Sequence, residues 1–220
     1  YLSMKDKNLL RIVVLISGRG TNLQAIIKAC NKNIDAKVVG VISNQINAAG
    51  LNIAHKNKIA FDAIEHKKFK SRDEFDDQLQ KCIKKYNPGL IILAGFMRIL
   101  GKKFINQFKG KILNIHPSLL PEFPGLNTHK RALEEKKKKH GASVHFVTEE
   151  LDGGPVVMQA TVPIFDYDNE ETLQHRVLEK EHIILPQSID WFSKGRLYLG
   201  DNNKIYFDEE VLKSPIQLKE

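Results

Sequence analysis

The pair Asn114 and His116 is the first feature of this sequence with residue types suited to chemistry. Both follow the apolar residues Ile112 and Leu113 in a predicted strand over residues 111–116. Residues two apart on a strand project to the same face, so the amide and the imidazole lie side by side. An amide can donate to a developing oxyanion while an imidazole gives or takes a proton, which suits acyl transfer. The alternative is a strand end that simply carries two polar residues.

Asp152 is the candidate carboxylate partner of this pair. It is followed by Gly153 and Gly154 ahead of a predicted strand, and two glycines allow a sharp turn that exposes the carboxylate. A carboxylate beside His116 is expected to raise the imidazole pKa and to favour the charged form. The alternative is an aspartate that only shapes a turn.

The loop Ser17–Asn22 is the candidate anion site. It follows the β-branched run at residues 11–16 and leads into a helix, so it offers free backbone N–H groups and the positive end of the helix dipole. Leu23 stands where a dinucleotide fingerprint needs a small residue, and Thr21 where a nucleotide P-loop has lysine. The loop therefore favours a phosphate but neither of those cofactors. The alternative is a tight turn with a helix cap.

A sheet must position these residues, and hydrophobic patterning predicts one. Apolar runs predict strands, and spacings of three and four predict helices. The predicted strands cover residues 11–16, 37–42, 60–64, 90–93, 111–116, 142–148 and 156–162, with a closing hairpin at 196–199 and 204–207. The predicted helices cover about residues 23–30, 48–57, 72–86, 104–108, 129–139 and 171–192.

The order of these elements predicts the fold class. Strands alternate with helices in the first half, which calls for a parallel sheet with right-handed crossovers, whereas the later strands lack intervening helices. We predict an α/β, Rossmann-like three-layer fold with a mostly parallel central sheet and an antiparallel C-terminal portion. Ligands bind such sheets beyond the carboxyl ends of the strands. That rule brings residues 17–22, 95–100 and 114–117 to one rim.

The composition limits the classes of partner. The net charge is +8, which favours anionic partners, but no aromatic residues are interleaved with the basic ones and no nucleic-acid motif is found. We therefore expect the run Lys136–Lys139 to be a solvated surface. No apolar run approaches the ~20 residues of a membrane span.

The cysteines and the other histidines give no further chemistry. Cys30 and Cys82 fall on apolar helix faces, which predicts core residues, no disulfide scaffold and a cytoplasmic protein. The remaining histidines show no metal-ligand spacing, and we expect them to be surface or structural residues. His145 alternates within a predicted strand and is expected to be a satisfied core residue.

Longer stretches of the sequence carry a family resemblance. Residues 114–121 (Asn-Ile-His-Pro-Ser-Leu-Leu-Pro), 140–147 (His-Gly-Ala-Ser-Val-His-Phe-Val) and 151–155 (Leu-Asp-Gly-Gly-Pro) closely resemble the folate-dependent phosphoribosylglycinamide formyltransferase family of de novo purine synthesis. Residues 17–26 and 93–100 also look like that family's. The Asn-x-His and Asp set is shared with other formyltransferases and implies the chemistry. The N-terminal loop and residues 140–155 are more particular and imply the glycinamide substrate.

The resemblance implies that a formyl group passes from 10-formyltetrahydrofolate, as co-substrate, to the amine of glycinamide ribonucleotide (GAR), without a metal. The implied catalytic residues are Asn114, His116 and Asp152. The implied GAR contacts are Gly20, Thr21, Asn22, Pro117 and Glu181. The implied folate contacts are Arg72, Met97, Arg98, Ile99, Leu100, Asn114, Thr148, Glu149, Glu150, Leu151 and Asp152. Leu178 stands where the family often has Lys or Gln near the phosphate, and Arg19 where it often has a small polar residue.

The resemblance also implies domain limits and partners. We expect a tail over residues 1–10, with residues 1–3 left over from expression, one formyltransferase domain over 11–193, and a hairpin and tail over 194–220. Apart from the small-molecule substrates we expect no nucleic-acid or membrane partner, and a monomer or homodimer.

Three alternatives remain open at the level of the sequence. Methionyl-tRNA formyltransferase and formyltetrahydrofolate hydrolase share the formyl chemistry, but each is expected to carry a further domain that this sequence has no room for. A non-catalytic binding module is the third, and the joint presence of Asn114, His116 and Asp152 weighs against it.

Overall fold

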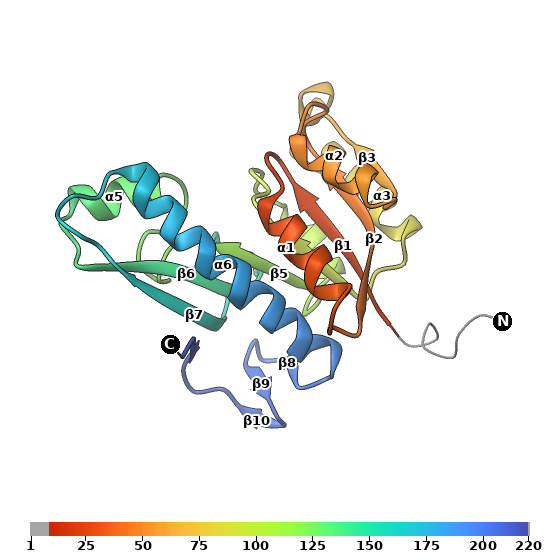
Figure 1. The fold of residues 1–220 in the computed structure, drawn as a ribbon. Helices are drawn as coiled ribbons and strands as arrows, with labels where there is room; N and C mark the ends of the chain where they lie inside the picture. Colours follow the sequence, from red (N-terminus) through yellow and green to blue (C-terminus); the bar gives the residue numbers. More distant parts are fainter. Residues whose placement is uncertain (1–8, 220) are drawn as a thin grey trace.

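An eight-stranded sheet forms the centre of the computed structural model, which describes residues 9–219 (Figure 1). The tail predicted over residues 1–10 lies outside the described residues up to residue 8, and Leu10 already begins the first strand. The strand order is β11-β7-β6-β5-β4-β1-β2-β3. The strands are β1 (Leu10–Ile16), β2 (Ala36–Ser43), β3 (Phe61–Ala63), β4 (Leu90–Leu93), β5 (Ile112–His116), β6 (Lys139–Phe146), β7 (Val156–Pro163) and β11 (Ile216–Gln217).

Helices cover both faces of this sheet and make three layers. The α-helices are α1 (Thr21–Cys30), α2 (Ala49–Lys56), α3 (Arg72–Lys85), α4 (Lys102–Gln107), α5 (Thr128–Glu134) and α6 (Glu170–Ser193), with a 3₁₀ turn, η2 (His66–Lys68). One buried cluster joins α1, α2 and α6 to one face of the sheet, and a second joins α3 and α4 to the other. Successive residues of β1 alternate between the two clusters, as a strand buried on both faces requires.

The sheet changes direction at β5. Strand β5 pairs in parallel with β4 but antiparallel with β6, which is antiparallel to β7. The predicted α/β fold with a mostly parallel sheet and an antiparallel C-terminal portion is confirmed. Consequently the carboxyl ends of β1, β4 and β5 lie at one edge, where the candidate site residues were expected.

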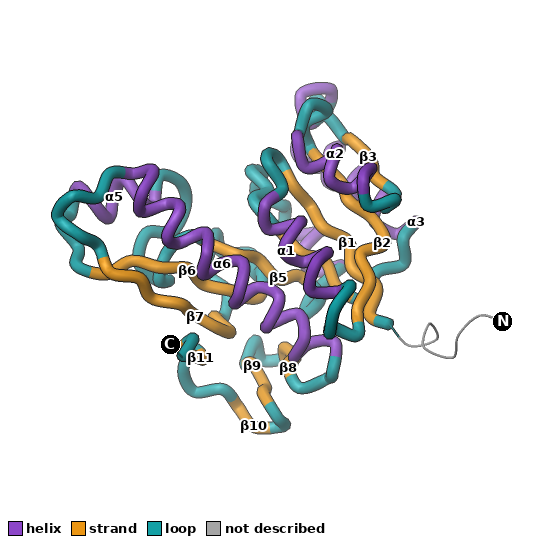
Figure 2. Tube along the Cα trace, in the orientation of Figure 1, coloured by secondary structure: helices purple, strands orange, loops and turns teal. Residues whose placement is uncertain are grey.

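The C-terminal segment contributes a second sheet and an added strand. The predicted hairpin is confirmed as β8 (Leu197–Leu199) and β9 (Ile205–Phe207), and β10 (Glu210–Val211) extends it to three strands. The chain then returns to the central sheet, where β11 lies beside β7 (Figure 2). Neither of these two-residue strands was predicted from the sequence.

The predicted end of one helix and the predicted start of the strand after it are both wrong. The helix expected over residues 129–139 ends at Glu134 as α5, and β6 begins at Lys139 rather than at Ala142. The strand starts earlier because Lys139 and His140 pair with Pro163 and Val162 of β7, a contact that the local sequence does not reveal.

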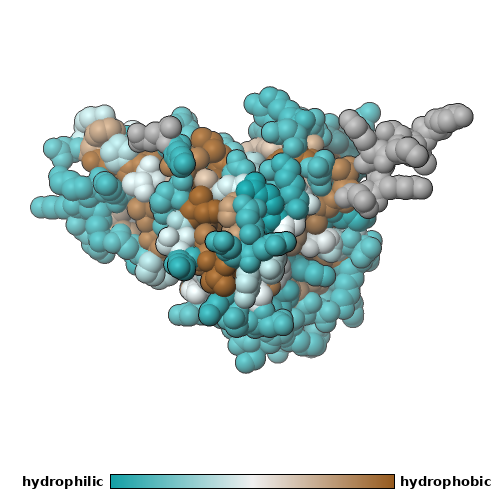
Figure 3. Space-filling view, turned by 90° about the horizontal axis from the view of Figure 1, so that it is seen from below, coloured by the Kyte–Doolittle hydropathy of each residue, from teal (hydrophilic) through white to brown (hydrophobic). Residues whose placement is uncertain are grey.

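The surface agrees with the composition. The face seen in Figure 3 is largely hydrophilic, with apolar residues gathered near its middle. Within residues 9–219, no helix is long and apolar enough to cross a membrane.

Candidate active site

Three side chains from two separate stretches of the sequence meet at the end of β5. Asn114 and His116 come from β5 itself, and Asp152 comes from the loop between β6 and β7. The Asp152 Oδ2 atom lies 3.5 Å from His116 Nδ1, and Asn114 Nδ2 donates to Asp152 Oδ1 at 3.5 Å. Only 10% of the Asp152 side chain is exposed, so its carboxylate faces the amide and the imidazole rather than bulk solvent.

The glycines after Asp152 make its position possible. Asp152 has a φ of 50°, in the left-handed region. A Cβ atom at Gly154 would lie 1.8 Å from the Phe146 carbonyl oxygen, so only glycine allows this approach to the end of β6. The turn predicted from the Asp-Gly-Gly pattern therefore carries the carboxylate inward.

Backbone groups of the loop after β5 orient both reacting side chains. His116 Nε2 lies 2.9 Å from the Phe123 carbonyl oxygen, and the Gly125 N–H donates to Asp152 Oδ2 at 2.8 Å. A carbonyl can only accept, so the hydrogen bond requires a proton on Nε2 of His116. The neutral imidazole then directs the lone pair of Nδ1 toward Asp152.

The ionisation of this pair differs from the expectation drawn from the sequence. Burial lowers the pKa of His116 and outweighs the opposing effects of the Phe123 carbonyl and of Asp152, so the free protein holds a neutral imidazole at neutral pH. Asp152 acts to raise the pKa of His116, as expected from the sequence, but the effect of burial is larger. Burial acts to raise the pKa of Asp152, but the neighbouring His145, the hydrogen bond from the Gly125 N–H and the nearby His116 outweigh it and lower that pKa.

His145 joins this cluster and was not among the predicted site residues. It lies directly opposite Asn114 in the β5–β6 pair, and the Asn114 amide nitrogen is 3.0 Å from His145 Nε2. His145 Nδ1 donates to the Phe146 carbonyl at 3.0 Å, which leaves Nε2 as the acceptor for the amide. His145 is thus a buried, satisfied residue that also fixes Asn114. The strand register reveals this role, and sequence spacing alone does not.

The predicted anion loop lies at the carboxyl end of β1. Gly20 has a φ of 77° and precedes α1, whose N-terminus has no side-chain cap, so its first N–H groups stay available. A Cβ atom at Gly20 would lie 2.6 Å from the Cα of Gly50, which explains the glycine at the start of α2. Thr21 is the first residue of α1, and Arg19 is exposed beside it.

Asn22 and Glu181 form a buried pair next to this loop. Asn22 Nδ2 donates to Glu181 Oε2 of α6 at 2.7 Å, while Asn22 Oδ1 is buried without a partner. Burial raises the pKa of Glu181 to about 7, although the hydrogen bond from Asn22 acts in the opposite direction. Glu181 therefore changes charge near neutral pH. Leu178, one turn earlier on α6, is half-buried and offers no hydrogen bond.

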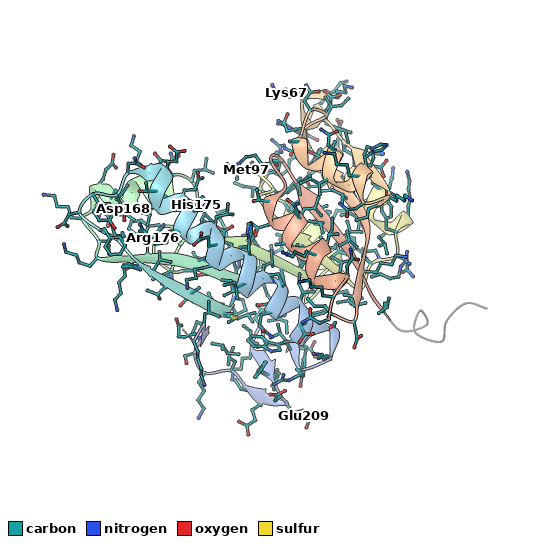
Figure 4. All side chains as sticks on the ribbon, viewed as in Figure 1. Lys67, Met97, Asp168, His175, Arg176 and Glu209 are labelled. Atoms are coloured by element: carbon teal, nitrogen blue, oxygen red, sulfur yellow. The ribbon has the colours of Figure 1, made fainter. Side chains whose placement is uncertain are left out.

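The loop after β4 presents apolar side chains to solvent. Met97 is 65% exposed and Ile99 51%, whereas Leu100 is buried. Figure 4 shows Met97 beside the loops that follow β1 and β4. The Met97 N–H donates to Ser17 Oγ at 2.8 Å, which ties this loop to the anion loop. At its other end, the Gly101 N–H donates to a carboxylate of α3, Asp76, at 2.7 Å.

The other predicted folate residues are less closely gathered. Arg72 is exposed at the start of α3, and the Arg98 guanidinium lies 5.4 Å from the centroid of the Phe75 ring. Leu151 is 52% exposed, next to Asp152. Thr148 is half-buried and Glu150 is exposed.

Two predicted residues have their polar contacts elsewhere. The Glu149 carboxylate accepts from Asn106 at 3.1 Å and pairs with Lys102 at 3.0 Å, so it faces α4 rather than Asp152. Pro117 is half-buried, and its carbonyl accepts from Thr128 Oγ at 2.6 Å. Among residues 9–219, no group of three or more His, Cys, Asp or Glu side chains is placed to hold a metal ion.

Comparison with known proteins gives consistent matches over nearly the whole chain. The formyl transferase family matches residues 10–189. Phosphoribosylglycinamide formyltransferase of Escherichia coli (strain K12) is 50% identical over 194 residues, 88% of this chain and 92% of that protein. The trifunctional purine biosynthetic protein adenosine-3 of Homo sapiens is 42% identical over 206 residues, 93% of this chain and 20% of that protein. The structure of phosphoribosylglycinamide formyltransferase from Coxiella burnetii has a TM-score of 0.91 and 49% identity, and covers 96% of this chain and 100% of that chain.

Proposed function

Because this chain belongs to the formyl transferase family, we propose that it transfers the formyl group of 10-formyltetrahydrofolate to the amine of GAR. The products are N-formyl-GAR and tetrahydrofolate, in purine biosynthesis. The observation that carries the proposal is the meeting of Asn114, His116 and Asp152 at one strand end. The chain that brings them together is 50% identical to a phosphoribosylglycinamide formyltransferase. The family's formyl-folate serves as co-substrate.

The chemistry follows from the hydrogen-bonding capacity of the three side chains. The GAR amine attacks the formyl carbon, and the carbonyl oxygen becomes an oxyanion that accepts a hydrogen bond from the Asn114 amide. His116 takes up a proton from solvent on Nδ1, whose lone pair is free in the unliganded protein, donates a hydrogen bond from it to the same oxygen, and returns the proton to solvent once the products leave. A preorganised donor of this kind lowers the barrier by roughly 3–4 kcal/mol.

Asp152 moves the proton that the reaction must transfer. The attacking nitrogen loses one proton as its bond to the formyl carbon forms, and the folate N10 gains one as the bond from carbon to N10 breaks. The lowered pKa of Asp152 keeps its carboxylate ionised and able to accept, directly or through a water molecule. These three side chains supply the chemistry that we propose, and no metal takes part.

The substrate contacts that we propose come from separate loops. Gly20, Thr21 and Asn22 bind the GAR phosphate through the open N-terminus of α1, supported by the uncapped N–H groups there. Glu181 contacts the ribose and Pro117 lines the same side. The exposed Arg19 offers the loop a positive charge that Leu178 does not.

The folate lies on the other side of Asp152 in this proposal. Its pterin ring packs between Met97–Leu100 and Thr148–Asp152, and Arg72 faces the benzoyl-glutamate carboxylates. The exposed apolar side chains of Met97, Ile99 and Leu151 support this assignment, because a flat apolar ligand would cover them.

We further propose that the protein acts in the cytoplasm, as a monomer or homodimer, without nucleic-acid or membrane partners. Both described cysteines are free thiols, as in a reducing compartment. We propose one formyltransferase domain over residues 11–193, followed by a hairpin and tail over 194–220, because every candidate site residue lies between Gly20 and Glu181.

A formyl-transfer assay with three acceptors tests the function. Purified protein is incubated with 10-formyltetrahydrofolate and GAR, methionyl-tRNA or water alone. We expect N-formyl-GAR and tetrahydrofolate in equal amounts, and neither of the other products above background. Formyl-methionyl-tRNA or free formate at a comparable rate would favour one of the related enzymes, and no turnover with any acceptor would favour a binding module.

A further inference from the structure

A row of polar side chains crosses four neighbouring strands and ends at His116. In the sheet register, His116 lies opposite Ser143, Ser143 opposite Gln159, and Gln159 opposite Gln217. Paired residues of neighbouring strands project to the same face, so this polar row runs in line across β5, β6, β7 and β11. These four strands are neighbours in that order in the sheet (Figure 2). Ser143 is fully buried and Gln159 is 9% exposed, so their polar atoms depend on partners within the protein.

Every polar atom of the two central side chains has a partner. Ser143 Oγ donates to the Ser118 carbonyl at 2.6 Å and accepts from the Leu120 N–H at 3.0 Å. Gln159 Nε2 donates to the Leu120 carbonyl at 2.8 Å and to Ser143 Oγ at 3.0 Å. Gln217 Nε2 lies 3.4 Å from Gln159 Oε1 and donates to it. Because the Leu120 carbonyl can only accept, the orientation of the Gln159 amide is fixed.

The backbone that this network holds is the segment that orients the catalytic pair. Ser118 and Leu120 belong to the loop after β5, which continues to the carbonyl of Phe123 and the N–H of Gly125. Leu119 packs over β6 where Gly141 leaves room, since a Cβ atom there would lie 2.7 Å from Leu119 Cδ2. The start of the loop is therefore fastened to the sheet by three consecutive residues.

We propose that Gln159 and Ser143 are positioning residues for formyl transfer, with Gln217 of β11 as the outer support of Gln159. They hold the loop at Ser118 and Leu120, and thereby place the Phe123 carbonyl and the Gly125 N–H against His116 and Asp152. The proposal rests on the proposed function for its kinetic effect. Neither residue has a hydrogen bond to Asn114, His116 or Asp152, because their polar contacts go to the loop, to each other and to Gln217.

The network affects charge as well as geometry. The Phe123 carbonyl raises the pKa of His116, and the Gly125 N–H lowers that of Asp152, so a displaced loop would move each pKa in the opposite direction. The other titratable or charged groups around His116 are His145, Arg131, His129 and His140. Replacing Ser143 removes none of them.

The experiment compares two buried serines. Ser143→Ala deletes the central hydroxyl, while Ser188→Ala makes the same change at an equally buried serine that donates only to the Ile184 carbonyl of its own helix. We expect Ser143→Ala to lower kcat by about tenfold or more, with KM for both substrates within about twofold. The acid limb of its kcat profile should move to higher pH, because Asp152 loses the Gly125 hydrogen bond. Ser188→Ala should change stability only.

Two further variants test whether the loss of kcat becomes smaller with distance from His116 along the polar row. Gln159→Leu removes the donor to the Leu120 carbonyl and the donor to Ser143, and should match Ser143→Ala. Gln217→Leu removes only the outer contact and should lower kcat by about twofold. If Gln159→Leu does not fold, Ser143→Ala and Gln217→Leu still decide the question. A kcat and pH profile of Ser143→Ala equal to those of Ser188→Ala would overturn the proposal.

A measurement without substrate separates this proposal from the proposed function. NMR titration of the imidazoles in isotope-labelled protein should give a lower pKa for His116 in Ser143→Ala than in the parent protein, and no change in Ser188→Ala. If the parent protein fails to formylate GAR, the proposed function fails while this titration still tests the network. An unchanged His116 pKa in an active enzyme would overturn the network alone.

Discussion

His116 and Asp152 face each other across 3.5 Å, yet their environments set opposite charge preferences. Burial keeps the imidazole neutral, while the neighbouring His145 and the hydrogen bond from the Gly125 N–H keep the carboxylate ionised. The site thus starts with a proton acceptor and an imidazole able to gain a proton during the reaction. Asn114 is the third member, and the amide is directed by His145 rather than by solvent.

Removing the His116 imidazole or the Asp152 carboxylate should slow chemistry more than binding. We expect Asp152→Asn and His116→Ala each to lower kcat by at least ~100-fold, because each loses proton transfer or oxyanion stabilisation. Steady-state kinetics with GAR and 10-formyltetrahydrofolate measure this effect. Asp166→Asn and His175→Ala are matched controls on exposed side chains and should keep normal turnover. Near-normal kcat in either site variant would exclude that residue from catalysis.

Glu181 gives a prediction for stability against pH. Its pKa rises from an ordinary 4.5 to about 7 on folding, so the protonated form favours the folded state. This contribution is complete below about pH 4.5 and is lost as the pH rises toward 7. Urea unfolding should show that Glu181→Gln gains up to ~3 kcal/mol relative to the parent protein between pH 4.5 and 8.

A second glutamate of α6 provides the control for this titration. Glu179 is largely exposed, so Glu179→Gln should leave the pH dependence of unfolding unchanged. A Glu181→Gln variant whose stability follows the parent protein at every pH would show that Glu181 titrates normally.

At the scale of elements, the sequence predicted the strands and helices that local hydrophobic pattern determines. Buried runs such as 11–16 gave the parallel strands, and the helix predicted from residue 72 begins there because the Ser71 hydroxyl accepts from the Glu74 N–H. The start of β6, the strand β11 and the contact of His145 with Asn114 were missed, since each depends on pairing between distant segments. The family pattern was enough to predict which site residues lie together. It could not predict the hydrogen bonds that these residues make to the loop after β5.

The turn after Asp152 gives a prediction at this scale. Gly154→Ala places a methyl group against the Phe146 carbonyl, where the unchanged backbone leaves 1.8 Å, so the end of β6 must shift. We expect a loss of about 1–3 kcal/mol in the free energy of unfolding and a lower kcat, since Asp152 moves with the turn. Gly18→Ala is the control, because a Cβ atom at Gly18 would have nothing within 4 Å. Equal stability of the two variants would contradict this account of the turn.

At the scale of the whole molecule, a net charge of +8 meets two anionic substrates. Long-range attraction speeds encounter and is screened by salt, while buried interactions are screened much less. We expect kcat/KM for GAR to fall several-fold between about 50 and 500 mM salt, with kcat changing far less. Stopped-flow or steady-state kinetics over a salt series measure this, and a kcat that falls in parallel with kcat/KM would show that salt acts on the chemical step.

The change of strand direction at β5 also orders the events of synthesis. During synthesis, β1 to β5 leave the ribosome before the rest of the chain. These strands pair in parallel with one another, and the strands and the helices between them come from neighbouring parts of the chain. The nascent chain therefore gains its anion loop and Asn114 before Asp152 and His145 emerge. We expect the partly synthesised chain to bind phosphate before it can catalyse formyl transfer.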